Sequence, residues 1–186
     1  MVMMIINKNK REKILIIKEK IPIFVLYLDK SIMANTPKPY KTKSKISVVS
    51  ESAVIASYQS LYGNPISVLT NSKNGLSAKA AIDFLNLSGF TKEEFQDTFK
   101  TNVKTIQNYV SNSSKLDAAL SEKLLKSFSL FDKGIEIFGS AKLFHQWLNT
   151  PSYGLGNQTP FDLMDTITGI TLIEEELIRI EYGDLA

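Results

Sequence analysis

The chain has 186 residues, 44% of them hydrophobic and 22% charged, with a formal net charge of +3. This composition excludes a wholly disordered, collagen-like or disulfide-stapled chain. The absence of cysteine and the presence of a single histidine, His145, exclude thiol catalysis, cysteine-ligated metals and two-histidine metal sites. No apolar run reaches the ~20 residues of a membrane-spanning helix and no signal-peptide pattern is present, so we expect a cytoplasmic protein with no membrane partner.

Charge is distributed unevenly along the chain. Residues 1–74 hold 12 Lys and Arg against 4 Asp and Glu, a net charge of +8. Residues 75–131 hold 7 against 6, and residues 132–186 hold 3 against 9, a net charge of −6. A basic front and an acidic rear suggest two partners, one of them polyanionic, although surface charge also drifts along chains that have no such partners.

We interpret residues 1–45 as a flexible basic leader. Met33 is a candidate translation start, because the Lys- and Pro-rich stretch that follows it is typical of an unstructured segment. A start at Met33 would remove seven basic and three acidic residues. The basic character of the whole chain is therefore weak evidence for nucleic-acid binding.

From Ser50 onward the spacing of apolar residues predicts about seven successive helices and no strand. The first is expected over about 50–62, where it would contribute to dimerisation or pack on the next half of the chain. In the second, Ser77 is the predicted cap and Gly89 the predicted end. Its predicted inner face is Ala81, Ile82 and Leu85.

The strongest local signal is a capping box at Thr91-Lys-Glu-Glu94, in which Thr91 serves the third helical amide while Glu94 reaches back. Phe90 and Phe95 occupy the positions of a hydrophobic staple around this start. The helix is expected to end near Phe99.

A further helix is predicted to begin at about Val103 and to carry two stripes. The apolar stripe is Val103, Ile106 and Val110, and the polar stripe is Lys104, Gln107, Asn108 and Ser111. Two short helices joined by a tight turn, the second with side chains that can hydrogen-bond to bases, match a DNA-binding helix-turn-helix. An ordinary helical hairpin with a solvated outer face fits the same periodicity.

The remaining pattern predicts a long helix followed by three shorter ones. An apolar stripe runs from Leu116 to Phe138, and Ser140 is the predicted cap of a helix over 141–148. Thr159 and Pro160 predict the start of another short helix that ends before Gly169. A second capping box is predicted at Thr171 and Glu174, which would put Glu174–Glu176 in an exposed first turn. The inner face of that last helix is predicted to be Ile173, Leu177 and Ile180, with Gly183 at its end.

No catalytic constellation accompanies these elements. His145 has no nucleophile or second histidine in a recognisable motif, and Gly154-Leu-Gly156 lacks the Lys and Ser or Thr of a phosphate loop. The run of acids at Glu174–Glu176 is not a metal motif, because consecutive residues point to different sides of a helix. We expect no enzyme, no metal and no cofactor.

Residues 75–186 resemble the Xre/MbcA/ParS-type antitoxins, the partners of RES-domain toxins. The resemblance rests on the helix-turn-helix and on a series of motifs that follows it in order. These are Leu116–Leu125, Phe138-Gly139, Trp147–Pro151, Leu155–Leu163, Thr166–Gly169 and Arg179–Gly183.

The resemblance implies an autorepressor that binds its own operator as a homodimer and holds a RES toxin inactive. The toxin, not this chain, would use NAD. The resemblance extends a DNA-binding role to Thr105 beside Lys104, Gln107, Asn108 and Ser111. The implied toxin-binding residues are Trp147, Leu155, Thr159, Pro160, Arg179, Glu181, Tyr182, Gly183 and Asp184. Asn108 and Lys123 stand where members of the family usually carry Arg, which forms bidentate contacts that Lys cannot reproduce.

The acidic rear suggests how a toxin would be blocked. A pocket that binds the phosphates of NAD needs cationic groups, and the anionic tail Glu181–Asp184 could occupy it, with Tyr182 as an aromatic anchor. The alternative is a tail that packs only on its own domain.

The sequence thus predicts an all-α protein with a helix-turn-helix region over 46–131 and a small helical toxin-binding domain over 132–186. The function implied is that of a type II antitoxin. The alternative is a stand-alone transcription regulator whose C-terminal half only dimerises.

Overall fold

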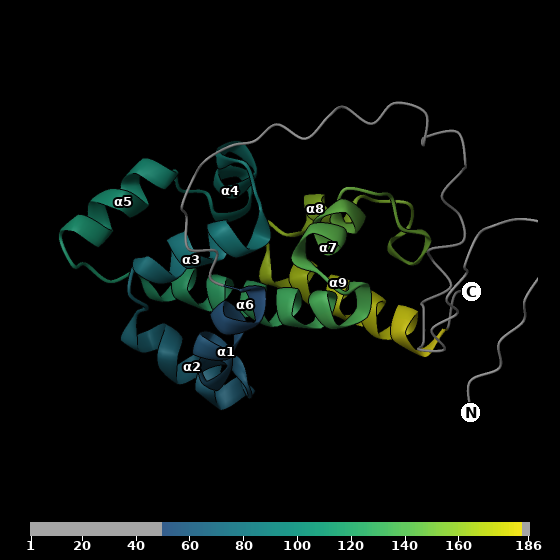
Figure 1. The fold of residues 1–186 in the computed structure, drawn as a ribbon, viewed down its shortest axis with the longest axis horizontal. Helices are drawn as coiled ribbons and strands as arrows, with labels where there is room; N and C mark the ends of the chain where they lie inside the picture. The colour runs from purple at the N-terminus through teal and green to yellow at the C-terminus, as the bar shows by residue number, and fades with distance from the viewer. Residues whose placement is uncertain (1–49, 184–186) are drawn as a thin grey trace, which may run out of the picture. The chain divides into compact units, whose positions relative to one another are not determined.

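The computed structural model describes residues 50–183, which form an all-α fold (Figure 1). The segment interpreted as a leader, including Met33, lies outside the described residues, as does Asp184. Within the described part the chain contains two isolated β-bridges and no strand. Its helices are α1 (Glu51–Tyr62), α2 (Pro65–Asn74), α3 (Lys79–Ser88), α4 (Lys92–Phe99), α5 (Val103–Ser111), α6 (Ala118–Phe138), α7 (Ala141–Leu148), the 3-10 helix η3 (Tyr153–Leu155), α8 (Pro160–Leu163) and α9 (Ile167–Tyr182).

The long helix α6 is the element on which the others pack (Figure 1). It contacts α1, α2, α3, α4, α7 and α9. Asp117 caps its start, and Gly139, at a φ of 85°, ends it in the left-handed conformation that glycine adopts without strain. Since α6 runs unbroken across residues 131 and 132, the helix-turn-helix region and the C-terminal region share one helix at the boundary predicted from the sequence.

Aromatic rings fill the centre of the core. Phe84 of α3 is fully buried, and its ring meets those of Phe128 and Phe131 edge-on at a centroid distance of 5.1 Å in both cases. Phe90 and Phe99 contact the same ring edge-on at 5.9 and 5.5 Å. Edge-to-face pairs add to the burial of apolar area, so α3, α4 and α6 are held around one side chain.

The helix α7 lies close against α6 because α6 has a glycine at the contact. A β-carbon at Gly134 would stand 2.4 Å from the ring of Phe144. Trp147, on the same face of α7, stacks on Phe138 at 5.4 Å and on Phe144 at 5.8 Å. Both large side chains of α7 are thus part of the core.

The first predicted helix is confirmed as α1, and it packs on α2, α3 and α6. The structure adds α2, which the sequence reading missed: Asn64 accepts a hydrogen bond from the Ser67 amide and Pro65 occupies the first helical position. In α3, Gly89 ends the helix as predicted, but the N-cap is Ala78, not Ser77. The buried face is also shifted from the predicted one and comprises Ala80, Ala81, Phe84, Leu87 and Ser88.

The predicted start of the last helix is wrong. The N-cap of α9 is Thr166, whose hydroxyl accepts from the Gly169 amide, and Thr171 lies inside the helix with its hydroxyl donating to the Ile167 carbonyl. Gly169 was expected to lie beyond a helix end, yet it is inside α9. The position requires glycine, because a β-carbon there would stand 1.8 Å from the Leu163 carbonyl oxygen. The three consecutive glutamates therefore lie in the middle of α9 and not in an exposed first turn.

The helix α9 runs parallel to α6, since its charged side chains meet those of α6 in the same order along both helices. Glu174 lies near Lys126 and Ser129 of α6, and Glu181 pairs with Lys133 at 2.7 Å. Burial raises the pKa of Glu174, and Lys126 partly opposes this. The end of α9 is thus attached to α6 by charge as well as by its apolar face.

Candidate functional site

The helix-turn-helix is built by local capping signals. In α4 both hydrogen bonds of the predicted capping box are present, from the Glu94 amide to the Thr91 hydroxyl and from the Thr91 amide to the Glu94 carboxylate. Lys100, at a φ of 53°, ends α4 in the left-handed region. Asn102 then accepts from the Thr105 amide at 2.8 Å and caps α5. The turn between α4 and α5 is therefore tight, as the sequence predicts.

The structure brings the predicted DNA-binding residues together on α5. Lys104, Gln107, Asn108 and Ser111 are exposed, whereas Thr105 is half-buried and its hydroxyl donates to Asn102. Val110 of the predicted apolar stripe is 41% exposed, because α5 projects beyond the core and only Val103 and Ile106 are covered.

A groove separates α5 from α4, and its charge is mixed. Lys104 and Gln107 line it from α5, and Lys92, Glu93 and Asp97 line it from α4. Lys92 and Lys104 attract a phosphate backbone to this face, and the two carboxylates weaken that attraction.

Lys123 forms contacts within the molecule and does not line this groove. Its ammonium donates to the Thr98 carbonyl at the end of α4 and, at 2.5 Å, to the Asp165 carbonyl between α8 and α9. Burial lowers the pKa of Lys123, and the charge of Asp165 partly opposes this. The side chain thus joins the helix-turn-helix to the C-terminal region.

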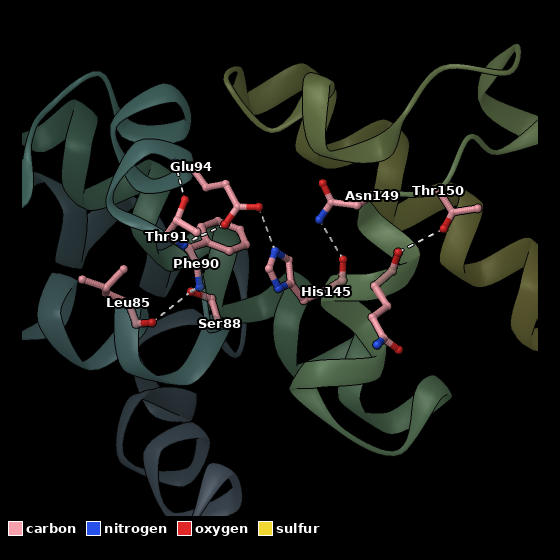
Figure 2. A network of polar contacts seen from close by, with 9 residues as sticks. Leu85, Ser88, Phe90, Thr91, Glu94, His145, Asn149 and Thr150 are labelled. Carbon is pink, nitrogen blue, oxygen red and sulfur yellow. Dashed lines mark hydrogen bonds and ion pairs between the residues drawn. The ribbon is translucent and has the colours of Figure 1, made fainter. Parts of the chain in front are cut away.

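A second connection between the two regions involves His145. Figure 2 shows its imidazole on α7 pointing at the capping carboxylate of α4, with Nε2 at 3.1 Å from Glu94 Oε1. The ring also packs on Phe90 at a centroid distance of 5.3 Å. His145 is therefore a packing and hydrogen-bonding residue, with no nucleophile beside it among the contacts of the described part.

The C-terminal region carries a compact loop between α7 and α8. Its two ends are joined by a hydrogen bond from the Ser152 amide to the Gln158 carbonyl, and the Asn157 amide donates to the Ser152 carbonyl. Tyr153 projects from this loop with 75% of its side chain exposed. The sequence reading overlooked Tyr153, although a large aromatic residue in a loop rich in Ser and Gly is a signal of a binding surface.

The predicted toxin-binding residues of the loop are mostly covered. Trp147 is 6% exposed and Pro160 is buried, while Leu155 and Thr159 are half-buried. Trp147 and Pro160 support the surface from inside.

The predicted residues at the end of α9 lie nearer the surface. Arg179 is paired with Glu176, and Glu181 with Lys133. Tyr182 is 81% exposed, and Gly183, at a φ of 74°, ends the helix as predicted. Glu181, the first residue of the predicted anionic tail, is thus held on α6 by Lys133.

Among residues 50–183 there is no group of three His, Asp or Glu side chains arranged to hold a metal ion. No helix in this range is long and apolar enough to cross a membrane.

Comparison with known proteins places this C-terminal region. Residues 133–183 match the model of the antitoxin Xre/MbcA/ParS C-terminal toxin-binding domain. The resemblance to the Xre/MbcA/ParS-type antitoxins is confirmed. The match covers the end of α6 and all of α7 to α9, so the loop with Tyr153 and the helix with Tyr182 both lie within the residues that resemble this domain.

Curated relatives extend the similarity toward the N-terminus. An antitoxin Xre of Photorhabdus laumondii is 26% identical over 110 residues, which cover 59% of this chain and 74% of the relative. An antitoxin Xre of Yersinia enterocolitica is 31% identical over 64 residues, or 34% of this chain and 43% of the relative. The Prs ADP-ribosylating antitoxin of a Sphingobium species is 24% identical over 139 residues, or 69% of this chain and 87% of the relative.

Proposed function

We propose that this chain is the antitoxin of a type II toxin–antitoxin system, which binds and inhibits a RES-domain toxin and represses its own operon. The observation that carries the proposal is the match of α7 to α9 with a toxin-binding domain. The name of the Sphingobium relative includes ADP-ribosylation, a reaction for which NAD, the substrate that the resemblance implies for the toxin, supplies the ADP-ribose. A non-enzymatic role fits the absence of a catalytic motif around His145.

The toxin-binding surface that we propose comprises the loop 152–158 and the end of α9. Tyr153 and Tyr182 are the most exposed large hydrophobic side chains of the described residues, at 75% and 81%. Tyrosine supplies a large contact area at a low entropic cost, which makes it a frequent anchor of protein interfaces. The tail that includes Asp184 carries the negative charge that a cationic NAD pocket would attract.

The DNA-binding surface that we propose is the outer face of α5. Lys104 would contact phosphate or guanine, and Gln107 and Asn108 would pair with adenine. Because Glu93 and Asp97 lie beside this face, we expect few phosphate contacts, a modest affinity and a shallow dependence of that affinity on salt.

The dimer that we propose uses the outer surface of α1 and α2. Residues 52–72 contain no Asp, Glu, Lys or Arg, in a chain of which 22% is charged. Ile66 and Leu69 are 72% and 48% exposed on this surface. A two-fold interface brings like residues together, and an uncharged surface meets its own copy without repulsion.

The deciding experiment is co-expression with the RES-domain toxin gene that the proposal expects beside this one. The antitoxin proposal expects that the chain restores growth of cells that make the toxin and that the two proteins co-purify. A stand-alone regulator would bind the DNA upstream of its own gene but would not rescue growth.

A paired set of variants separates the two activities. Lys104→Ala with Gln107→Ala should weaken binding to upstream DNA and leave growth rescue intact. Tyr153→Ala with Tyr182→Ala should weaken growth rescue and leave DNA binding intact. Lys142→Ala, an exposed change on α7, is the control for DNA binding. Equal DNA affinity of the Lys104 and Lys142 variants would overturn the assignment of α5.

A further inference from the structure

The loop 152–158 is held against α9 by a buried carboxylate. Glu176 is only 4% exposed, although it lies in the middle of a surface helix. Its Oε1 accepts from the Ser152 hydroxyl at 2.7 Å, and its Oε2 accepts from Arg179 Nε at 2.8 Å. Burying an ionised carboxylate is costly unless every oxygen is paired, and here both oxygens have partners.

The backbone of the loop approaches this carboxylate more closely than any side chain would permit. A β-carbon at Gly154 would stand 2.0 Å from Glu176 Oε2. The Arg179 guanidinium, which pairs with Glu176 at 2.7 Å, also lies 3.4 Å from the Gly154 carbonyl oxygen. Ser152, Gly154, Glu176 and Arg179 therefore interlock, and we refer to these four residues as the latch.

The latch flanks Tyr153 on both sides. Ser152 and Gly154 are the residues immediately before and after it. Ser152 is bonded to Glu176, and Gly154 lies against the Glu176 carboxylate with its carbonyl facing Arg179. The tyrosine between them points outward and is 75% exposed. A side chain whose backbone is already ordered loses less entropy when it is bound, which raises affinity without an additional contact.

A buried ion pair is weak as a source of stability, because well-packed apolar residues of similar size do as well or better. The buried carboxylate of Glu176 is therefore better explained by the geometry that it imposes on the loop than by the stability that it adds to the fold.

We propose that the latch is a positioning device that presents Tyr153 as an anchor for an apolar, aromatic-accepting pocket on the toxin, an inference that rests on the proposed function. Glu176 is then a positioning residue that acts on the partner through the loop. Tyr153 is the residue that makes the contact.

The test compares Glu176→Gln with Tyr153→Ala in the full chain, by the dissociation rate of the co-purified toxin measured with surface plasmon resonance. Glu176→Gln keeps the shape of the side chain and removes the charge that holds Arg179. We expect each variant to dissociate about tenfold faster or more, as for the loss of an interface anchor. Glu175→Gln, on the exposed neighbour, is the matched control and should dissociate like the wild type.

A double-mutant cycle separates positioning from general destabilisation. If Glu176 acts through Tyr153, the double variant dissociates no faster than Tyr153→Ala alone, whereas unrelated effects multiply. Hydrogen exchange of the free chain gives a second readout: Glu176→Gln should speed exchange of the Asn157 amide and leave the amides of α6 unchanged. Gly154→Ala should have the same local effect.

The outcomes of this test are distinct. Multiplying effects in the cycle, or a wild-type dissociation rate for Glu176→Gln, would overturn the latch while leaving the antitoxin proposal in place. A wild-type chain that does not bind the toxin would overturn the antitoxin proposal and with it the role of Tyr153. A wild-type exchange rate for the loop amides in the Glu176→Gln variant would overturn the latch, whichever protein the chain binds.

Discussion

At the scale of single residues, the aromatic side chains of the C-terminal region divide into two groups. Trp147 lies in the core between Phe138 and Phe144, whereas Tyr153 and Tyr182 are exposed. Trp147 therefore serves packing, and the residues available to a partner are its neighbours in the loop and at the helix end. This division separates effects on stability from effects on binding.

Trp147→Ala should lower the free energy of unfolding by about 3–5 kcal/mol, since it removes a buried ring and leaves a cavity. The measurement is equilibrium unfolding in urea followed by circular dichroism. Tyr153→Ala is the control, and at an exposed position it should change the free energy of unfolding by less than about 0.5 kcal/mol. Equal losses in the two variants would contradict the assignment of Trp147 to the core.

Glu94 gives the fold a dependence on pH. Burial acts to raise its pKa, but hydrogen bonds from the Thr91 backbone and from His145 outweigh this and leave the pKa below its ordinary value of 4.5. Because the pKa is lower in the folded chain, the carboxylate stabilises the fold fully above pH 4.5, and this contribution is lost as the pH falls through the folded value.

Glu94→Gln should therefore cost stability near neutral pH, by about 1 kcal/mol, and less in acid. The free energy of unfolding, measured in urea from neutral pH down to below the folded pKa, should fall less steeply for this variant than for the wild type. Glu93→Gln, on the exposed neighbour in the same helical turn, is the control. A difference between Glu94→Gln and the wild type that stays constant down to acid pH would refute the role of ionisation.

At the scale of helices, the features that depend on neighbouring residues were predicted from the sequence better than those that depend on contacts between distant residues. The caps at Thr91 and Ser140 were readable because each requires only residues within one turn of the helix. Thr166 and Thr171 present the same local chemistry, so the cap pattern alone did not decide between them and the start of α9 was misplaced. The structure has Thr166 as the cap, with Thr171 inside the helix.

The burial of Glu176 could not be predicted from the sequence, because it depends on a contact between distant residues. An acid between two other acids is typical of a solvated face, and Glu176 is covered only because the loop with Ser152 packs on it. The helix α2 was missed for another reason: the pair Asn64-Pro65 that ends α1 is also a helix start signal.

Gly134→Ala tests the contact between α6 and α7. The added methyl group would overlap the ring of Phe144, with the nearest carbon at 2.4 Å. Because overpacking of a core costs about 1–3 kcal/mol, the variant should unfold at a lower temperature in circular dichroism. Adding Phe144→Leu should recover part of the loss, and a double variant that is less stable than the additive expectation would argue against the contact.

At the scale of the whole molecule, the two proposed binding surfaces share a single core. The ammonium of Lys123 joins α4 to the segment before α9, and Lys100 pairs with Asp165 at 3.5 Å across the same contact. His145 and Glu94 form a second joint. The helix-turn-helix is therefore attached to the proposed toxin-binding region by polar contacts as well as by the core, and two such units in the proposed dimer would present two α5 helices at a fixed spacing.

That spacing depends on the dimer, which the uncharged surface of α1 and α2 is proposed to form. Leu69→Glu places a charge at its centre, where a two-fold contact would bring two like charges together. We expect this variant to sediment as a monomer at concentrations at which the wild type is a dimer. Its affinity for a palindromic operator should fall at least about tenfold, because each half-site is then bound separately.

Leu143→Glu is the matched control, since Leu143 on α7 is 49% exposed and Leu69 is 48% exposed. A Leu69→Glu chain that remains dimeric would assign the interface to another face of the molecule, and a dimeric wild type that is disrupted only by Leu143→Glu would assign it to α7.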